Sequence, residues 1–193
     1  MRRVSLWLIG ILLTGLAVGA AGLGYVRATG LSARAKPSEA ETGVARAIRW
    51  FAVSRSNRSR TNPVPRSEEA VRAGLEHFAD HCAVCHGNDG RGATNFGRGM
   101  FPPSPDLRAE PTQGMTDGEL FYIIENGVRF TGMPAFASGT PAGEEESWKL
   151  VHFIRRLPRL SEPELERMKE LNPRPPEEIR QEIAEEEFLR GER

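Results

Sequence analysis

Cys82-Ala83-Val84-Cys85-His86 is the stretch that decides the interpretation of this 193-residue chain. Its two thiols are the only cysteines in the sequence, and an imidazole follows the second of them directly. On a short helical turn, two thiols at this spacing reach the two vinyl groups on one porphyrin edge, and the imidazole reaches the iron from one face. The stretch therefore predicts one covalently bound haem c, with Cys82 and Cys85 as thioethers and His86 as an axial iron ligand.

Other interpretations of a Cys-x-x-Cys pair explain less. A thioredoxin-type redox pair needs a strand–helix–strand context that the sequence lacks. A zinc site would need further ligands, and without a second cysteine pair only His77 and His81 are near enough in sequence to contribute. A chance pair would not explain the adjacent His86.

The opposite axial position needs a second ligand, and Thr131-Gly132-Met133-Pro134 offers one. A thioether is a soft ligand that stabilises reduced iron, so His/Met ligation raises the reduction potential relative to two nitrogen ligands. The glycine frees this loop and the proline fixes it. Met100 and Met115 also lie in expected loops, but neither has this setting, so Met133 is the expected iron ligand.

The residues around these ligands predict helices joined by long Gly- and Pro-rich loops, without a convincing strand pattern. A first helix is expected after an N-cap at Ser67, with an apolar stripe that runs to Cys82. A second runs from a capping box at Thr116 to Gly127, and a third spans about residues 144–157. The fold class is therefore all-α, with a domain whose centre is supplied by the cofactor.

Residues 67–157 resemble a class I c-type cytochrome, specifically the small bacterial membrane-anchored monohaem kind. The motifs that carry the resemblance are Gly74-x-x-x-Phe78, Cys82-Ala83-Val84-Cys85-His86-Gly87, Gly90-Arg91-Gly92, Pro105-Asp106-Leu107, Asn126-Gly127 and Gly132-Met133-Pro134. The resemblance implies that the first and last helices cross with Gly74 and Phe78 against Trp148 or Phe153. It also implies that a loop proline carbonyl orients His86 by accepting its ring N–H. Pro105 is the expected residue in the run Pro102, Pro103 and Pro105.

The N-terminal residues predict an apolar helix. After a stub of residues 1–3, residues 4–26 form an uncharged run of 23 residues. A helix of that length spans roughly 34 Å, just over the ~30 Å hydrocarbon core of a bilayer. An uncleaved transmembrane anchor is the leading interpretation. A cleaved signal sequence, with the small residues 17–21 as its cleavage site, and a buried soluble helix are the alternatives.

Residues 27–66 are expected to form a basic tether, because residues 1–66 hold eleven Lys or Arg against two Asp or Glu. Within it, residues 42–53 show the spacing of an amphipathic helix with interleaved arginines. Such a helix suits the bilayer interface, where anionic lipid attracts arginine, but it could equally pack on the soluble domain or on a partner subunit. Asn62-Pro63-Val64-Pro65 ends the tether.

Residues 161–193 are expected to form an acidic helical tail. A capping box at Ser161 and Glu164 begins a helix that runs to Leu171, and a last helix extends to about Leu189. We interpret the tail as a solvated or partner-docking appendage. The positive charge of the chain lies beside its apolar N-terminus and not on the folded domain, which argues against nucleic-acid binding.

The functional prediction is one-electron transfer between redox protein partners, with no catalytic residues and no small-molecule substrate. The alternatives are a cytochrome subunit of a larger membrane oxidoreductase, and a haem enzyme or gas-binding protein if the distal site is open. Membrane lipid is the further expected partner, through anchor and tether. Haem attachment takes place outside the cytoplasmic membrane, so residues 67–160 are expected to face the periplasm on a single-pass protein.

Overall fold

The structure is a computed structural model that describes residues 2–173 and 176–190. The chain divides into two compact units, Met1–Ala35 and Lys36–Arg193. All regular structure in the described residues is helical, which confirms the all-α fold class predicted from the sequence.

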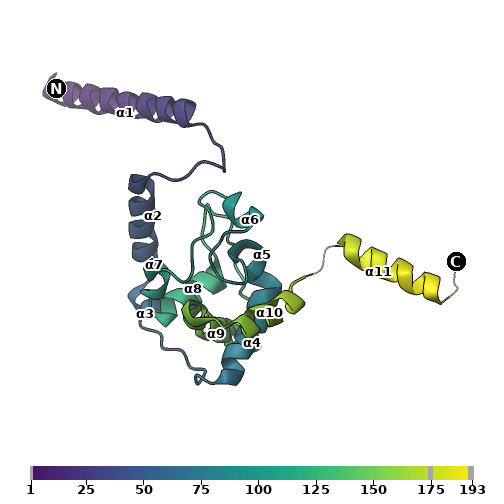
Figure 1. The fold of residues 1–193 in the computed structure, drawn as a ribbon. Coiled ribbons are helices and arrows are strands. Elements are labelled where there is room, and N and C mark those ends of the chain that lie inside the picture. Colours follow the sequence, from purple (N-terminus) through teal and green to yellow (C-terminus); the bar gives the residue numbers. More distant parts are fainter. Residues whose placement is uncertain (1, 174–175, 191–193) are drawn as a thin grey trace. The chain divides into compact units, whose positions relative to one another are not determined.

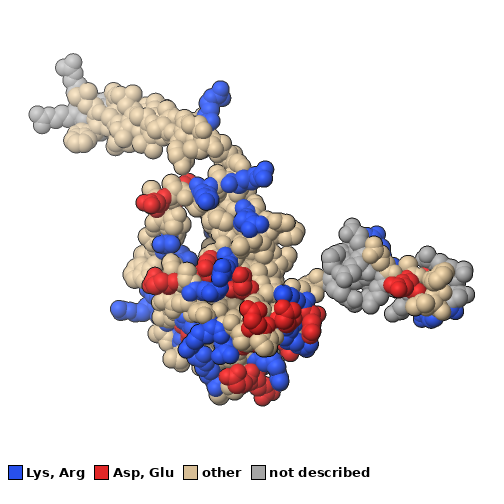
Figure 2. All heavy atoms as spheres, viewed as in Figure 1, with Lys and Arg blue, Asp and Glu red and all other residues tan. Residues whose placement is uncertain are grey.

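The first unit is built on a single apolar helix, α1 (Arg2–Thr29). The 24 residues Leu6–Thr29 are long and apolar enough to cross a membrane, and none of them is buried against the rest of the protein. Thr14 and Thr29 turn their hydroxyls back onto carbonyls one helical turn earlier, which satisfies these polar groups within the helix. In Figure 2 the described side chains of this helix are uncharged except near its C-terminal end, whereas the unit that begins at Lys36 carries both signs. A membrane anchor and a signal sequence both have this form.

The second unit begins with α2 (Glu39–Ala52) and the short α3 (Arg55–Arg58). Helix α2 starts three residues earlier than the sequence predicts because Ser38 and Glu41 form a capping box. The chain then runs along the haem domain, where Val53 is 2% exposed and the side-chain amide of Asn62 donates to the carbonyl of Trp148 at 2.9 Å.

The core of the second unit is the crossing of α4 (Glu68–His77) with α9 (Pro141–Arg156), at the base of the unit in Figure 1. Gly74 permits the crossing because it has no side chain. A Cβ at this position would lie 2.2 Å from the carbonyl oxygen of Lys149, which is too close for the two helices to pack as they do. The rings of Phe78 and Phe153 meet one turn further on, with centroids 5.1 Å apart. Both contacts have the form that the family resemblance implies.

A π-helical turn, η1 (Phe78–Cys82), follows α4 and leads into α5 (Ala83–His86), so the attachment motif continues the first helix. π-Turns of this kind often occur at functional sites. Two single-turn helices, α6 (Asn95–Arg98) and α7 (Glu110–Gln113), interrupt the long loop that follows. Helix α8 (Asp117–Asn126) has the predicted capping box at Thr116 and the predicted Gly127 end.

Residues 57–64, which the sequence analysis assigned to the tether, pack on α8 and α9. The guanidinium of Arg60 lies 4.4 Å from the ring centroid of Phe121, which itself stacks on Trp148 at 4.0 Å. Gly118 lets the chain approach, since a Cβ there would lie 2.0 Å from the carbonyl oxygen of Asn57. The structured part of this unit therefore extends N-terminal to Ser67.

A 3-10 turn, η2 (Leu157–Arg159), ends α9, and the tail then forms α10 (Glu162–Leu171) and α11 (Pro176–Leu189). Helix α10 packs on the core through Met168, whose exposed fraction is 0%. With its amide oriented to satisfy the network, Asn172 donates to the carbonyl of Ala79 at 3.1 Å and exchanges hydrogen bonds with Asn88. The first helix of the tail is thus part of the folded domain and braces both flanks of the attachment motif.

Candidate haem site

The attachment motif presents two free thiols and an imidazole on one helical turn. Cys82 ends η1, while Cys85 and His86 lie in α5, and both cysteines are half-buried. Burial, with a smaller contribution from Cys85, raises the pKa of the Cys82 thiol to about 12. Burial also raises the pKa of Cys85. Before any covalent attachment, both sulfurs are therefore protonated at neutral pH.

The loop after the motif folds back over it. The amide of Gly92 donates to the carbonyl of His86 at 2.7 Å, and the hydroxyl of Thr94 donates to the carbonyl of Cys85 at 3.0 Å. Gly97 lies so close that a Cβ there would be 2.3 Å from the Cys85 carbonyl oxygen. These contacts hold α6 against the attachment turn.

His86 is held between the aromatic core and the Pro105 segment. Burial lowers the pKa of His86, and the backbone carbonyl of Pro105 raises it. The ring Nδ1 is nevertheless buried without a hydrogen bond of normal geometry. The segment that carries Pro105 is positioned by a bond from the amide of Leu107 to the carbonyl of Gly90 at 2.8 Å. Among the three loop prolines, the structure brings Pro105 to the ring.

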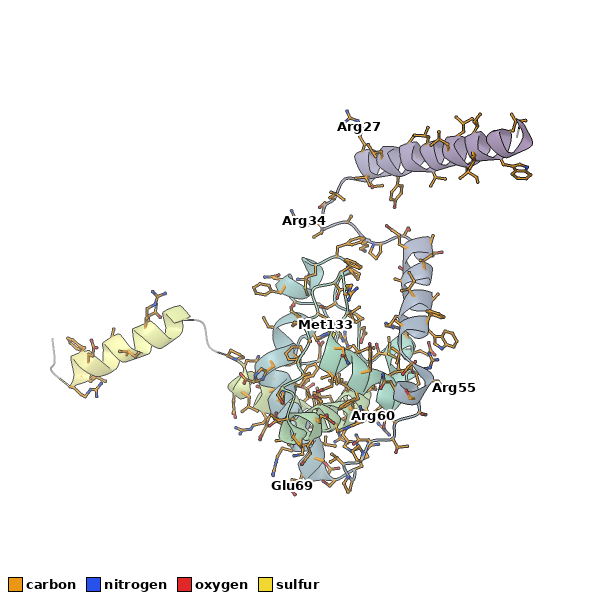
Figure 3. All side chains as sticks on the ribbon, turned by 180° about the vertical axis from the view of Figure 1, so that it is seen from behind. Arg27, Arg34, Arg55, Arg60, Glu69 and Met133 are labelled. Atoms are coloured by element: carbon orange, nitrogen blue, oxygen red, sulfur yellow. The ribbon has the colours of Figure 1, made fainter. Side chains whose placement is uncertain are left out.

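Met133 lies on a loop, residues 127–134, that is closed by its own hydrogen bonds. The Thr131 hydroxyl accepts from the amide of Met133 at 3.1 Å and donates to the carbonyl of Val128 at 2.8 Å. The amide of Val128 donates to the carbonyl of Met133 at 3.2 Å. Met133 is half-buried in the loop-rich part of the unit (Figure 3). Thr131 therefore positions the Met133 backbone, a role that the sequence analysis missed.

Met100 contacts the same loop, and its thioether fills the space in front of Gly132. A Cβ at Gly132 would lie 1.9 Å from Sδ of Met100. Through the segment of residues 94–104, the Met133 loop is thereby connected to the attachment turn. Met115 instead packs against the hydrophobic core. The pairing of Met100 with Gly132 joins distant stretches of sequence, and no local pattern signals it.

Arg108 is the arginine of the haem-enclosing loops that the structure singles out. Its Nε is buried and has no hydrogen-bond partner, although its backbone amide donates to Asp106 at 2.8 Å. In contrast, Arg91 pairs with Asp89 and Arg98 bonds to Asn95. A buried N–H without an acceptor is costly, so the Nε of Arg108 suits a bound hydrogen-bond acceptor such as an anionic group.

The remaining histidines have structural partners. His77 lies 3.7 Å from a carboxylate oxygen of Glu146, and His81 lies 3.2 Å from one of Asp80. The Nε2 atom of His152 is 2.8 Å from the carbonyl oxygen of Val64. Across the part of the chain that the structure describes, no group of three or more His, Cys, Asp or Glu side chains is arranged to hold a metal ion.

The donor set fits a c-type haem: two protonated thiols and an imidazole share one turn, and one nitrogen of that imidazole is buried without a hydrogen-bond partner. These features define a c-type cytochrome domain. Residues 69–154 match the family described as cytochrome C oxidase, cbb3-type, subunit III. This part of the chain is a cytochrome c domain of that family, and such a domain transfers electrons through a covalently bound haem.

One solved structure that is similar to this chain belongs to the reducing HAO-like protein complex of Kuenenia stuttgartiensis. The two are 23% identical in sequence and superpose with a TM-score of 0.42. The match covers 51% of this chain and 49% of the other, so it spans about half of each.

Proposed function

We propose that the chain is a one-electron carrier and not an enzyme, anchored in the cytoplasmic membrane with its haem domain in the periplasm. When haem is bound, its iron supplies the redox chemistry by cycling between ferric and ferrous states. The observation that carries the proposal is the Cys82–His86 turn in a cytochrome c domain, with a buried ring nitrogen ready to be oriented.

Each candidate residue has a distinct role. Cys82 and Cys85 would form the thioethers, His86 and Met133 would bind the iron, and the carbonyl of Pro105 would accept the Nδ1–H of His86. The effect of the Pro105 carbonyl on the His86 ring and the closed loop around Met133 support these assignments. A thioether held on a fixed loop would leave no site on the iron for small molecules, as electron transfer requires.

Arg108 pairs with a haem propionate in this proposal. Its buried, unpartnered Nε supports the pairing, because a carboxylate would accept a hydrogen bond from this N–H. A positive charge held there also favours ferrous over ferric iron and so raises the reduction potential.

The proposed organisation has five parts: a cytoplasmic stub at residues 1–3, an anchor at 4–26, a basic tether at 27–66, the haem domain at 67–160 and an acidic tail at 161–193. The end of the tether, residues 57–64, and the first helix of the tail, α10, pack on the haem domain. The Leu6–Thr29 helix supports the anchor. Arg27 lies in the last turn of this helix, and Arg34 and Lys36 follow it. By the positive-inside rule, these three charges oppose a periplasmic location of the domain. Haem attachment outside the cytoplasmic membrane outweighs that count, since an N-terminal apolar segment is read as an export signal.

Covalent attachment is tested by acid-acetone extraction of the purified full-length chain. The haem should stay with the polypeptide, and Cys82→Ala combined with Cys85→Ala should abolish covalent haem. Extraction of all haem from the wild-type chain would contradict the proposal.

Topology is tested by adding protease to intact spheroplasts. Loss of the haem-staining band would place the domain outside the membrane, as proposed. Protection of that band until lysis would overturn the periplasmic location without affecting haem attachment.

A cytochrome subunit of a larger membrane oxidoreductase is the second candidate, and the description of the matched family as an oxidase subunit supports it. A pull-down of the full-length chain in mild detergent distinguishes the two. Stoichiometric recovery of other membrane subunits would favour the second candidate, and recovery of the chain alone would favour the independent carrier.

A further inference from the structure

Helix α2 presents a continuous apolar stripe to solvent. At 100° per residue, one side of the helix carries Ala40, Val44, Ala47, Ile48 and Phe51. Val44, Ile48 and Phe51 are 59%, 62% and 84% exposed, and no residue of α2 is buried. An exposed apolar stripe on a helix of a folded unit marks a contact surface.

The contacts of α2 with the rest of the unit lie near its C-terminal end and involve Arg49 and Trp50, not the apolar stripe. The guanidinium of Arg58 lies 4.4 Å from the ring centroid of Trp50 and donates to the Trp50 carbonyl. Arg49 is half-buried, and burial and Arg46 lower its pKa while Glu119 of α8 raises it. The helix ends at the buried Val53. These contacts leave the apolar stripe free, so packing of the stripe on the domain, one expectation from the sequence, does not occur.

We propose that the apolar stripe of α2 lies in the headgroup region of the bilayer, on an anionic lipid surface. This inference rests on the proposed membrane anchoring by α1. Residues 30–38 separate α1 from α2, and nine extended residues span at most about 30 Å, so α2 stays within reach of the bilayer surface. An interfacial helix of this kind buries its apolar face about 5–10 Å into the boundary between headgroups and acyl chains.

The net charge of the segment around α2 favours an anionic lipid surface over a protein partner. Residues 27–52 hold five Lys or Arg against Glu39 and Glu41, an excess of three positive charges. A net positive charge next to an anionic bilayer strengthens the attraction between the two. The consequence is that the haem domain lies against the membrane through α2 and does not hang from a flexible tether of residues 27–66.

The test uses the full-length, haem-loaded chain in liposomes that contain anionic lipid. Because haem occupies Cys82 and Cys85, a single introduced cysteine is the only free thiol. Ala47→Cys places it on the stripe, and Ala45→Cys is the matched control on another side of the same helix. A water-soluble maleimide should modify Ala47→Cys about tenfold more slowly than Ala45→Cys, a ratio equivalent to about 1.4 kcal/mol. Adding Ile48→Glu to Ala47→Cys should restore the fast rate, since Ile48 is exposed and its replacement leaves the core intact.

Flotation and haem staining of the same liposomes separate this inference from the proposed function. If the chain fails to float with lipid or lacks haem, the proposed anchoring or haem attachment is wrong. If the floating, haem-stained chain shows equal rates at the two positions, the stripe does not bind lipid and the inference is overturned. Slow modification of Ala47→Cys that disappears when the protein is diluted in excess lipid would assign the stripe to a second copy of the chain, which also overturns it.

Discussion

Thr131 and Gly132 decide where the Met133 thioether lies. The hydroxyl of Thr131 closes the loop from both sides, and Gly132 leaves the space that Met100 fills. A loop held in this way can present a thioether at a fixed position without support from a regular helix. The strength of an iron–sulfur bond depends on that positional precision, because a weak soft ligand is easily displaced.

Replacing Met133 by alanine is expected to keep haem covalently attached, lower the reduction potential and open the iron to added imidazole or carbon monoxide. The physical reason is loss of the soft ligand that stabilises ferrous iron. Optical spectroscopy and a potentiometric titration measure both effects. Met115→Leu is the matched control, because Met115 packs on the core and its replacement should leave spectrum and potential unchanged. A Met133→Ala spectrum and potential identical to the parent would show that Met133 is not the ligand.

Replacing Arg108 by glutamine is expected to lower the reduction potential, because removal of a positive charge beside the proposed propionate favours ferric iron. A two- to tenfold change in the redox equilibrium corresponds to about 20–59 mV for a one-electron couple. The control is Arg98→Gln, since Arg98 is exposed and bonds to Asn95. Equal potentials for the Arg108 variant and the control would rule out the propionate pairing.

At the scale of elements, the crossing of α4 and α9 holds the attachment motif in place, because η1 and α5 continue from the end of α4. The crossing depends on close backbone approach at Gly74 and on the Phe78–Phe153 contact. Helix α10 adds support from the tail through the buried Met168.

Replacing Gly74 by alanine should destabilise the holoprotein by about 1–3 kcal/mol, since the added Cβ would collide with the Lys149 carbonyl and Phe153. Gly43→Ala is the matched control: Gly43 has open space around it in the exposed helix α2, so the same substitution should stabilise by about 0.5–1 kcal/mol. Denaturant midpoints of the two variants measure the difference. Similar midpoints would show that the two helices do not pack as described.

The docking of α10 should weaken in acid through Glu164. Burial raises the pKa of Glu164, but hydrogen bonds from Ser161 and Arg156 outweigh it and hold the pKa below the ordinary value of 4.5. A carboxylate with a lowered folded-state pKa stabilises the fold above its unfolded-state pKa, and this contribution is lost as pH falls through the folded-state pKa.

Glu164→Gln should therefore lower the free energy of unfolding by about 1 kcal/mol at neutral pH, after screening by solvent. The difference in unfolding free energy between the variant and the wild-type chain should disappear below about pH 4.5. Denaturant midpoints as a function of pH give the comparison. Glu166→Gln, on the exposed side of the same helix, is the control and should have little effect at any pH. A difference in stability that persists unchanged in strong acid would show that the charge of the Glu164 carboxylate does not hold α10 in place.

The parts of the fold that local signals specify could be predicted from the sequence. The capping boxes at Thr116 and Ser161 marked the starts of α8 and α10, and the spacing of Cys82, Cys85 and His86 marked the attachment turn. The packing of Arg60 on Phe121 and of Met100 on Gly132 could not be predicted. Each joins residues far apart in sequence, and only the folded chain brings them together.

The packing of the tail was also not predictable from local sequence patterns. Its helix to Leu171 was predicted, but its packing was not, because Met168 is a single apolar residue in a charged segment. Composition alone favours a solvated helix there. The hydrogen bonds of Asn172 to both flanks of the attachment motif add a link that only the folded structure reveals.

At the scale of the whole molecule, the chain combines an apolar helix long enough to span a bilayer with a cytochrome c domain at residues 69–154. Each of these two parts has a distinct role in the proposed function. In that proposal the helix would confine diffusion to the membrane plane, and the domain would carry one electron at a time between protein partners. The role of the domain depends on one haem group that remains bound during redox cycling.

A potentiometric titration of the purified full-length chain, followed by optical spectroscopy, tests this account most directly. The account predicts a single one-electron couple, a low-spin spectrum in both oxidation states, a weak long-wavelength sulfur-to-iron band in the ferric state, and no spectral change on addition of carbon monoxide. A high-spin, five-coordinate spectrum that changes at once with carbon monoxide would contradict it and would identify a gas-binding or catalytic haem site instead.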